Sequence, residues 1–236
     1  MAALSSPPDT PTPRLSAAER VFGHLKTDIV ALRLPPGTRL SEADVALEMD
    51  VSRQPVRDAF YRLSRLGFLT IRPQRATVVS VISEAAVLRA RFIRAALEIE
   101  TVRAAATTLS AGDHAALATL VAAQRAAIAA GDRQAFHRLD DEMHRQIAIR
   151  AGLGYAWDVI EDNKAHMDRV RHLTLASTSD TAHAEHVALL AALARRDAEA
   201  AAVLIRDHLG RIVDQLAALR RENRDWFAAD GPDAGS

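Results

Sequence analysis

Four side chains in the second half of the chain have types and spacings that suit metal binding. Asp140 and His144 are four residues apart, so on a helix they lie above one another on one face. His186 lies ten residues before a helix break predicted at 196–197, and His208 lies eleven residues after it. Two antiparallel helices meeting at that break would place both histidines about 15 Å from the turn. The two histidines are therefore predicted to be neighbours.

A carboxylate and three imidazoles that converge in a helical core suit Zn²⁺ first, and also Ni²⁺ or Mn²⁺. Such a set leaves one or two positions on the ion for water or a ligand. The same spacings have explanations without metal. Two buried histidines can be satisfied by hydrogen bonds, and an Asp–His pair can be a surface ion pair. The spacing of the residues leaves these alternatives open.

A second group of residues is basic and lies in the first third of the chain. Residues 14–80 carry 11 Lys/Arg against 7 Asp/Glu, whereas residues 81–236 carry 19 against 22. Between Arg53 and Arg75 there are six arginines and one acid, Asp58. This excess predicts an anionic partner for the segment, with a solvated helix face as the alternative.

Three short helices are predicted to position these arginines. Apolar residues at three- and four-residue spacing predict a helix over 16–33, which the Pro-Pro-Gly run at 35–37 ends. A second helix starts near Ser41, and a tight turn at 50–51 leads to Ser52, a good N-cap for a third helix to about Leu66. Two short helices joined by so brief a turn predict a helix-turn-helix.

The third helix has two distinct faces. Val56, Phe60 and Leu63 form its buried stripe, while Arg53 and Arg57 share an outward face. Since a helix-turn-helix places its second helix in the major groove, the arginines could grip a guanine edge or a phosphate.

Three further residues are candidates for DNA contact. Ser52 and the first free N–H groups of the third helix can hold a phosphate, and Gln54 could reach a base edge. Two short β-branched segments, 68–72 and 77–81, predict strands around a turn at 74–76. That turn would be a wing, with Arg75 placed for the minor groove or the DNA backbone.

The rest of the chain is predicted to be helical, which makes the fold class mainly α. A winged helix-turn-helix over 15–81 is followed by an all-α helical bundle over 84–228, and residues 1–14 and 229–236 are predicted to be disordered tails. The bundle's helices are expected at 84–109, 111–130, 133–150, 154–176, 180–195 and 198–228.

Composition argues against several protein classes. The chain has no run of about 18 apolar residues, so no membrane span is predicted. The first residues lack the pattern of a signal peptide. The chain has no cysteine, which excludes disulfides and thiolate metal sites and fits a reducing cytoplasm.

The first third of the chain resembles the GntR family of bacterial regulators. The resemblance covers about residues 16–80 and rests on the runs at 36–42, 51–59 and 66–69, with Leu63 between the last two. It implies a winged helix that binds a palindromic operator on double-stranded DNA as a homodimer, through Ser52, Arg53, Arg57 and the wing turn. The chain departs from the family at Ala76, where the wing usually has glycine.

Residues 85–216 resemble the FCD ligand-binding domain of the FadR subfamily, in their matches at 94–98, 140–144, 185–186, 192–193, 197 and 207–209. The resemblance implies a divalent metal ion on Asp140, His144, His186 and His208, which helps to hold the carboxylate of a small organic acid. Arg94 and Arg171 stand at the positions for contacting that acid, although Glu98, four residues on, could simply pair with Arg94. Leu153 follows Gly152 where an asparagine is frequent in the family. Four further histidines of this domain show no such partner pattern and are expected at the surface or the pocket rim: His137, His166, His172 and His183.

The predicted function is therefore a ligand-responsive transcriptional regulator without catalytic activity, and the resemblance implies repression. Two other functions fit the metal-binding set. A metal-responsive regulator would use the ion itself as effector. A metallohydrolase would use metal-bound water as nucleophile, but the sequence offers no separate general base and the DNA-reading segment would be unexplained.

Overall fold

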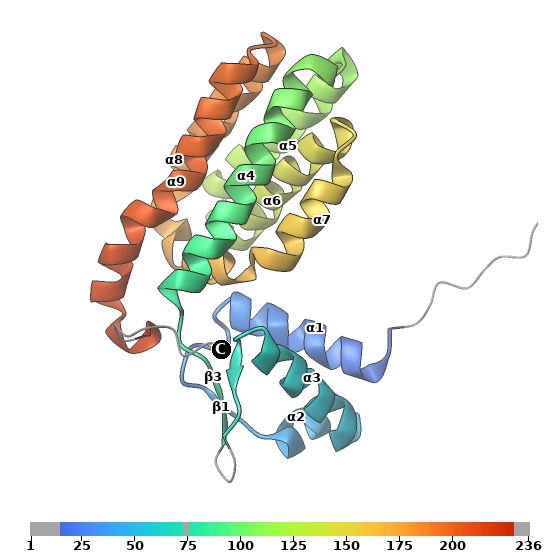
Figure 1. The fold of residues 1–236 in the computed structure, drawn as a ribbon, viewed down its shortest axis with the longest axis vertical. Helices are drawn as coiled ribbons and strands as arrows, with labels where there is room; N and C mark the ends of the chain where they lie inside the picture. The colour runs from blue at the N-terminus through green and yellow to red at the C-terminus, as the bar shows by residue number, and fades with distance from the viewer. Residues whose placement is uncertain (1–14, 73–75, 229–236) are drawn as a thin grey trace, which may run out of the picture. The chain divides into compact units, whose positions relative to one another are not determined.

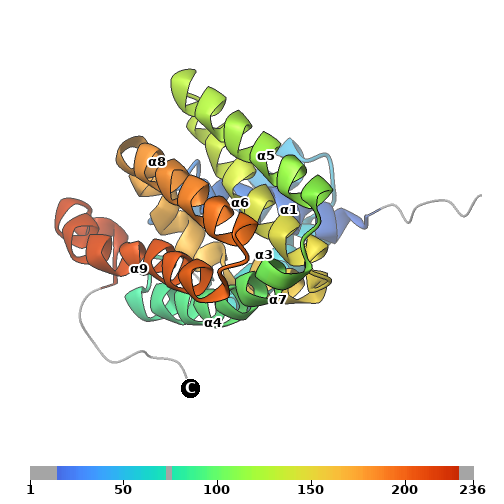
Figure 2. The same ribbon diagram turned by 90° about the horizontal axis from the view of Figure 1, so that it is seen from above.

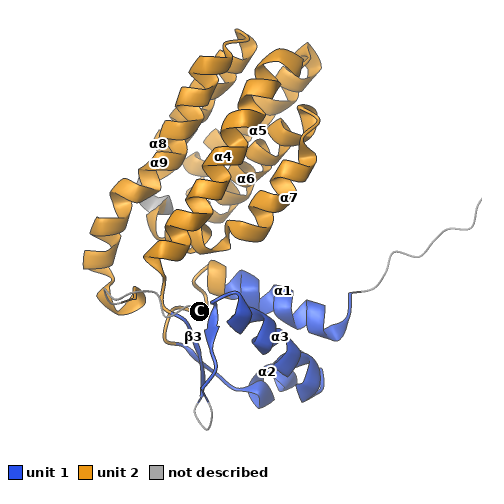
Figure 3. Cartoon of the chain, viewed as in Figure 1, with its two compact units in different colours: residues 1–28, 38–80 blue, residues 29–37, 81–236 orange. Residues whose placement is uncertain are grey.

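The computed structural model describes residues 15–72 and 76–228, apart from the side chains of 175–177. These residues form two compact units (Figure 3). The described residues up to Asp28, with Thr38–Ser80, belong to unit 1; Ile29–Gly37 and the residues from Val81 onward belong to unit 2. Arg75 of the predicted wing and the two predicted tails lie outside the described residues.

Unit 1 contains the predicted helix-turn-helix. Most of α1 (Ala17–Val30) belongs to it, followed by α2 (Glu42–Glu48) and α3 (Arg53–Arg65). The Ser41 hydroxyl accepts hydrogen bonds from the first N–H groups of α2 and so begins that helix. Asp50, with φ of 51°, makes the tight turn between α2 and α3. The predicted buried stripe of α3 is confirmed, with Ala59 added to it.

A small antiparallel sheet completes unit 1. Its strands are β1 (Arg39–Leu40), β2 (Leu69–Thr70) and β3 (Thr77–Val79), in the order β1-β3-β2. The two strands predicted on either side of the wing are confirmed but shorter, and Leu69 pairs with Val79. Strand β1 was not predicted, because two residues are too few to show a periodicity.

Unit 2 is a bundle of long helices (Figures 1 and 2). Its helices are α4 (Glu84–Thr108), α5 (Ala111–Ala129), α6 (Arg133–Arg150), α7 (Gly154–Asn163), α8 (Ala165–Ala194) and α9 (Ala198–Glu222). Helix α4 packs against α8 and α9, and α5 packs against α6 and α8. Short side chains cap several of these helices; Ser110 and Asp113, for example, form a capping box at the start of α5. The mainly α fold class is confirmed.

The helix break predicted at 177–179 in unit 2 is wrong. Helices were expected over 154–176 and 180–195, but the chain breaks at Lys164 and α8 continues to Ala194. The Ser/Thr-rich stretch read as a break is helical, and the Thr174 and Thr178 hydroxyls donate to the carbonyls of Arg171 and Thr174 within the helix.

The predicted last helix also ends early, at Glu222. A 3₁₀ turn, η1 (Arg224–Trp226), follows it. Phe227 then forms a parallel bridge with Ile82, supported by a hydrogen bond of 2.7 Å from Ile82 N to the Trp226 carbonyl. No helix within the described residues is both long and apolar enough to cross a membrane.

Candidate metal centre and DNA-binding surface

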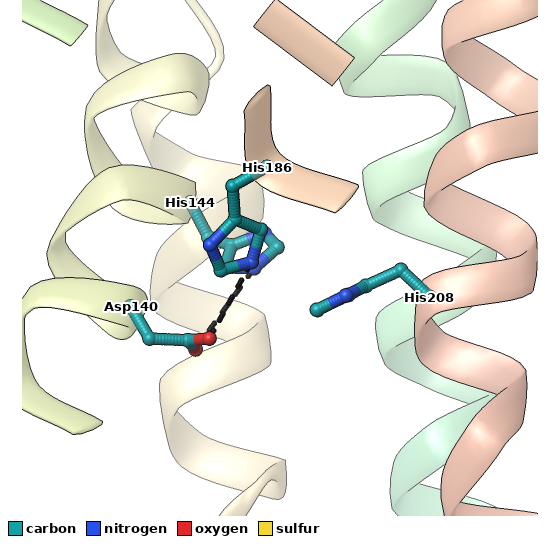
Figure 4. A group of neighbouring side chains, drawn as sticks. All are labelled: Asp140, His144, His186 and His208. Atoms are coloured by element: carbon teal, nitrogen blue, oxygen red, sulfur yellow. Dashed lines mark ion pairs between the residues drawn. The ribbon is translucent and has the colours of Figure 1, made fainter. Parts of the chain in front are cut away.

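Three helices of unit 2 bring the four predicted ligands together. Asp140 and His144 lie on α6, His186 on α8 and His208 on α9, and Figure 4 shows their side chains pointing toward a common centre. One nitrogen or carboxylate oxygen from each lies within 4.8 Å of those of the others. The rings of His186 and His208 are 4.8 Å apart between centroids, so the predicted neighbourhood of these two histidines is confirmed.

Each of the three imidazoles has a partner on its outer nitrogen. His186 Nδ1 lies 2.8 Å from Gln124 Oε1, and His208 Nδ1 lies 2.8 Å from Glu185 Oε2. His144 Nδ1 lies at an ion-pair distance of 2.6 Å from Glu98 Oε2, without the geometry of a hydrogen bond. A hydrogen-bond acceptor behind Nδ1 is the usual support of a histidine that binds metal through Nε2.

The inner nitrogens face the carboxylate. His186 Nε2 lies 3.5 Å from one Asp140 oxygen and His144 Nε2 lies 4.0 Å from the other. Both of these Nε2 atoms are buried and have no hydrogen-bond partner within the described part of the chain. A buried ring nitrogen without a partner is costly, and a metal ion would satisfy both atoms at once. The residues present therefore fit a divalent ion.

Burial sets the protonation of the site. It lowers the pKa of His186 well below its usual value, despite the nearby Asp140, and lowers that of His208 to about 3, with the help of His144. For Asp140, burial alone would raise the pKa, but Arg171 and the histidines lower it well below the usual range. His186 and His208 are thus neutral imidazoles and Asp140 a carboxylate, which are the forms that bind metal.

A pocket borders this cluster within unit 2. It holds about 540 Å³ of empty space, open mouth included, and Asp140, His208, Arg94 and Arg171 are among its lining residues. A third arginine and a set of apolar and neutral polar side chains complete the wall: Arg211, Phe136, Met167, Ala182, Leu209, Ile212, Thr174, Thr178 and Gln215. A small acid that entered here would meet both predicted arginines and two of the four candidate ligands.

The two pocket arginines predicted from the sequence are held by carboxylates. Arg94 is 1% exposed and pairs with Glu98, as the four-residue spacing suggested. Its Nη2 is buried and has no hydrogen-bond partner among the described residues. Arg171 pairs with Asp140, Asp141 and Asp168.

A second acidic cluster in unit 2 is already neutralised. His137, Asp141 and Asp168 lie close enough for a metal, but Lys164 Nζ lies 2.6 Å from both carboxylates. The Lys164 ammonium and the Arg171 guanidinium supply the positive charge that a metal ion would otherwise bring to this cluster. His137 is buried against His172, with ring centroids 4.5 Å apart, so its expected place at the surface or the pocket rim is wrong. The cause is that α6 turns this face toward α8.

The candidate DNA-reading residues in unit 1 share an exposed surface of α3. Ser52, Arg53, Gln54 and Arg57 are all exposed. Ser52 stands at the N-cap, yet its hydroxyl makes no capping hydrogen bond, so the first N–H groups of α3 are left for another acceptor. Arg57 forms a two-point contact with Glu42 of α2, at 3.4 Å and 3.1 Å, and Gln54 donates to Asp58.

Each of the two units matches a known protein family or domain. The family model of "Bacterial regulatory proteins, gntR family" matches residues 17–79, and the FCD domain model matches residues 90–211. The HTH-type transcriptional repressor RspR of Escherichia coli is 36% identical over 214 residues, covering 90% of this chain and 94% of that protein. The chain belongs to the GntR family.

Other GntR-family relatives agree with this assignment. A probable D-xylose utilization operon transcriptional repressor of Paenarthrobacter nicotinovorans is 29% identical over 202 residues, covering 83% of this chain and 87% of that protein. The solved structure of E. coli McbR/YncC superposes with a TM-score of 0.69 at 25% identity, covering 89% of this chain and all of the other. The protein is accordingly a DNA-binding transcriptional regulator with an FCD domain, and its family is non-enzymatic.

The sequence did not reveal which side chains contact the outer nitrogens of the three candidate metal-binding histidines. Gln124, Glu185 and Glu98 come from α5, α8 and α4, and no spacing along one helix relates them to the histidines that they contact. Only for Glu98 was there a signal, namely its position four residues after Arg94. The others depend on which helices pack together.

Proposed function

We propose that this GntR-family protein is a homodimeric regulator that acts in the cytoplasm and binds a palindromic operator through α3. In this proposal unit 2 binds a divalent metal ion and a small organic acid, and the acid changes operator affinity. Two relatives have the word repressor in their names, which favours a repressor that the acid releases from DNA.

The DNA-binding part of the proposal rests on the exposed surface of α3. Arg53 and Arg57 offer planar guanidinium groups to base edges or phosphates, and the uncapped start of α3 offers N–H groups to a phosphate. Gln54 and Arg75 are proposed to add contacts to a base edge and to the minor groove. One recognition helix covers one half-site, so a palindromic operator requires two copies of the chain.

The observation that carries the metal site is the pair of buried Nε2 atoms that face Asp140 without a hydrogen-bond partner in the described residues. Asp140, His144, His186 and His208 would hold the ion, with Zn²⁺ favoured and Ni²⁺ or Mn²⁺ possible for the same donor set. The bound ion would supply a Lewis acid for a ligand oxygen. A histidine core held by hydrogen bonds among the described residues would require partners for these two nitrogens, and none is present there.

The pocket supports an organic acid as the ligand. Arg94 Nη2 is buried beside the pocket with hydrogen-bonding capacity to spare, and Arg171 lines the same wall. Glu98 and the aspartates fix both guanidinium groups in place, so little side-chain entropy would be lost when a carboxylate binds. Arg94 and Arg171 are therefore the proposed ligand-binding arginines.

A binding experiment with the full chain tests this function. An operator would first be selected from random duplex DNA, and its affinity would then be measured for metal-stripped protein, Zn²⁺-loaded protein and Zn²⁺-loaded protein with each of a panel of small carboxylic acids. We expect a twofold-symmetric selected sequence and a change in affinity with at least one acid. A full response to Zn²⁺ alone would favour the metal-responsive regulator. Failure to enrich any sequence would contradict the operator-binding role.

A further inference from the structure

A buried glutamine contacts one of the candidate metal ligands and the backbone carbonyl of the residue before another. Gln124 is fully buried and comes from α5, a helix that supplies none of the four ligands. Its Oε1 lies 2.8 Å from His186 Nδ1, and its Nε2 donates to the Leu139 carbonyl at 3.1 Å. Both ends of the amide are therefore in contact with groups beside the candidate metal site.

The Leu139 carbonyl fixes which way this amide points. A carbonyl oxygen can only accept, so the nitrogen end of Gln124 must face Leu139 and the oxygen end must face His186. The oxygen end also only accepts. His186 must then donate from Nδ1, which leaves the lone pair of the neutral ring on Nε2, the nitrogen that faces Asp140.

We propose that Gln124 is a positioning residue that holds His186 in its metal-binding tautomer. The inference rests on the metal site of the proposed function. Through Leu139, the residue before Asp140, the same side chain also ties the α6 backbone to α8. One amide thus aligns ligands from two helices.

Gln124 differs in kind from the supports of the other two histidines. Glu98 and Glu185 are carboxylates, and arginines contact both of them: Arg94 contacts Glu98 and Arg211 contacts Glu185. Gln124 is neutral and needs no counter-ion. Its direction is set by a backbone carbonyl, which cannot change protonation, so the tautomer of His186 is fixed independently of whether the pocket holds an anion.

The test uses the full-length protein and the variant Gln124→Met, which keeps the length of the side chain but removes both hydrogen bonds. Arg125→Met is the matched control, because Arg125 is the next residue of α5 and its exposed side chain pairs with Asp180 on the surface. Zn²⁺ affinity would be measured by competition with a chromogenic chelator. We expect Gln124→Met to lose about 10- to 100-fold in Zn²⁺ affinity and Arg125→Met to bind as the unsubstituted protein does.

Nitrogen NMR of the metal-free protein gives a second readout that a purely structural role would not move. His186 should carry its proton on Nδ1 in the unsubstituted protein and show a mixture of tautomers in Gln124→Met. An Nε2-protonated His186 in the unsubstituted protein, or equal Zn²⁺ affinity in the two Met variants, would overturn the inference. Absence of Zn²⁺ binding by the unsubstituted protein would overturn the proposed metal site, and the NMR result would still decide the tautomer.

Discussion

The two units each contain an arginine–glutamate pair at the candidate site, in opposite surroundings. In unit 1, Arg57 pairs with Glu42 on the surface, and the Arg57 side chain is 61% exposed. In unit 2, Arg94 pairs with Glu98 in the interior, where the side chains are 1% and 5% exposed. The two pairs are built from the same residue types, yet they suit different tasks.

An exposed pair can exchange partners at little cost, whereas a buried pair cannot. Water and salt screen the Arg57–Glu42 contact, so a phosphate or a base edge can replace the carboxylate. Removing Glu98 would leave an uncompensated charge in the interior, and this makes Arg94 part of a fixed framework. The exposed surface of α3 thus suits a polyanion, and the buried pair in unit 2 is fixed in place whether or not the proposed ligand is bound.

The largest predicted effect is on the buried pair. Glu98→Ala should lower the free energy of unfolding of unit 2 by about 3–5 kcal/mol, because Arg94 loses its partner while it remains buried. Chemical denaturation would measure this. Glu100→Ala, on the same helix but 69% exposed, is the control and should leave stability nearly unchanged. Equal losses of unfolding free energy in Glu98→Ala and Glu100→Ala would contradict the difference between the buried and the exposed glutamate.

Acid should destabilise the metal-free unit 2 selectively. Burial lowers the pKa of His137 and His186, that of His172 to about 4 and that of His208 to about 3. The unfolded chain, with histidine pKa near 6.5, therefore binds more protons than the folded chain below that pH. Stability should fall as the pH drops from about 6.5 toward 3–4. Denaturation followed by NMR signals of each unit checks this, since unit 1 has one histidine, the exposed His24. Loss of both units over the same pH range would argue against the proposed cause.

Single substitutions on α3 should weaken operator binding without unfolding the protein. Arg53→Ala or Arg57→Ala should cost roughly 5- to 150-fold in affinity if the arginine reads a base, and binding should weaken as salt rises. Fluorescence anisotropy with operator and with random DNA would separate base reading from phosphate contact. Unchanged operator affinity in both variants would contradict the assignment of Arg53 and Arg57 to operator binding. Arg65→Ala, at the other end of α3, is the matched control.

The smallest predicted effect is on the exposed pair itself. Glu42→Ala should leave the melting temperature unchanged within error, since the contact is screened by water. It should also raise the affinity for random DNA slightly, because a carboxylate is removed beside Arg57. A fall in melting temperature as large as that for Glu98→Ala would show that the two pairs do not differ as described.

Structural features that follow from helical periodicity or from distance to a shared turn could be predicted from the sequence. Contacts that depend on which helices pack together could not. The faces of α3 and the alignment of Asp140 with His144 follow from helical periodicity, and both were predictable. The neighbourhood of His186 and His208 was predictable from their distances to a shared turn, since Arg195–Asp197 separates α8 from α9 as expected. Gln124 and Glu185 were not predictable, because each meets its histidine only through helix packing.

The break at Lys164 shows the limit of local signals. The sequence near 177–181 is rich in Ser and Thr, which suggests a loop, yet it is helical, and the Thr178 hydroxyl is satisfied by the Thr174 carbonyl within the helix. Lys164 looks like an ordinary helical residue. Its ion pairs with Asp141 and Asp168 bury the side chain where α7 ends and α8 begins, and Asp141 comes from α6. A contact with another helix thus accompanies a boundary that local propensity does not show.

Metal content tests the central claim most directly. Protein purified without an affinity tag would be stripped with a chelator, reconstituted with Zn²⁺, desalted and measured by elemental analysis beside the His186→Ala/His208→Ala double variant. The account predicts one ion per chain in the unsubstituted protein and none in the double variant. No ion in the reconstituted protein, or a full complement in the double variant, would contradict it.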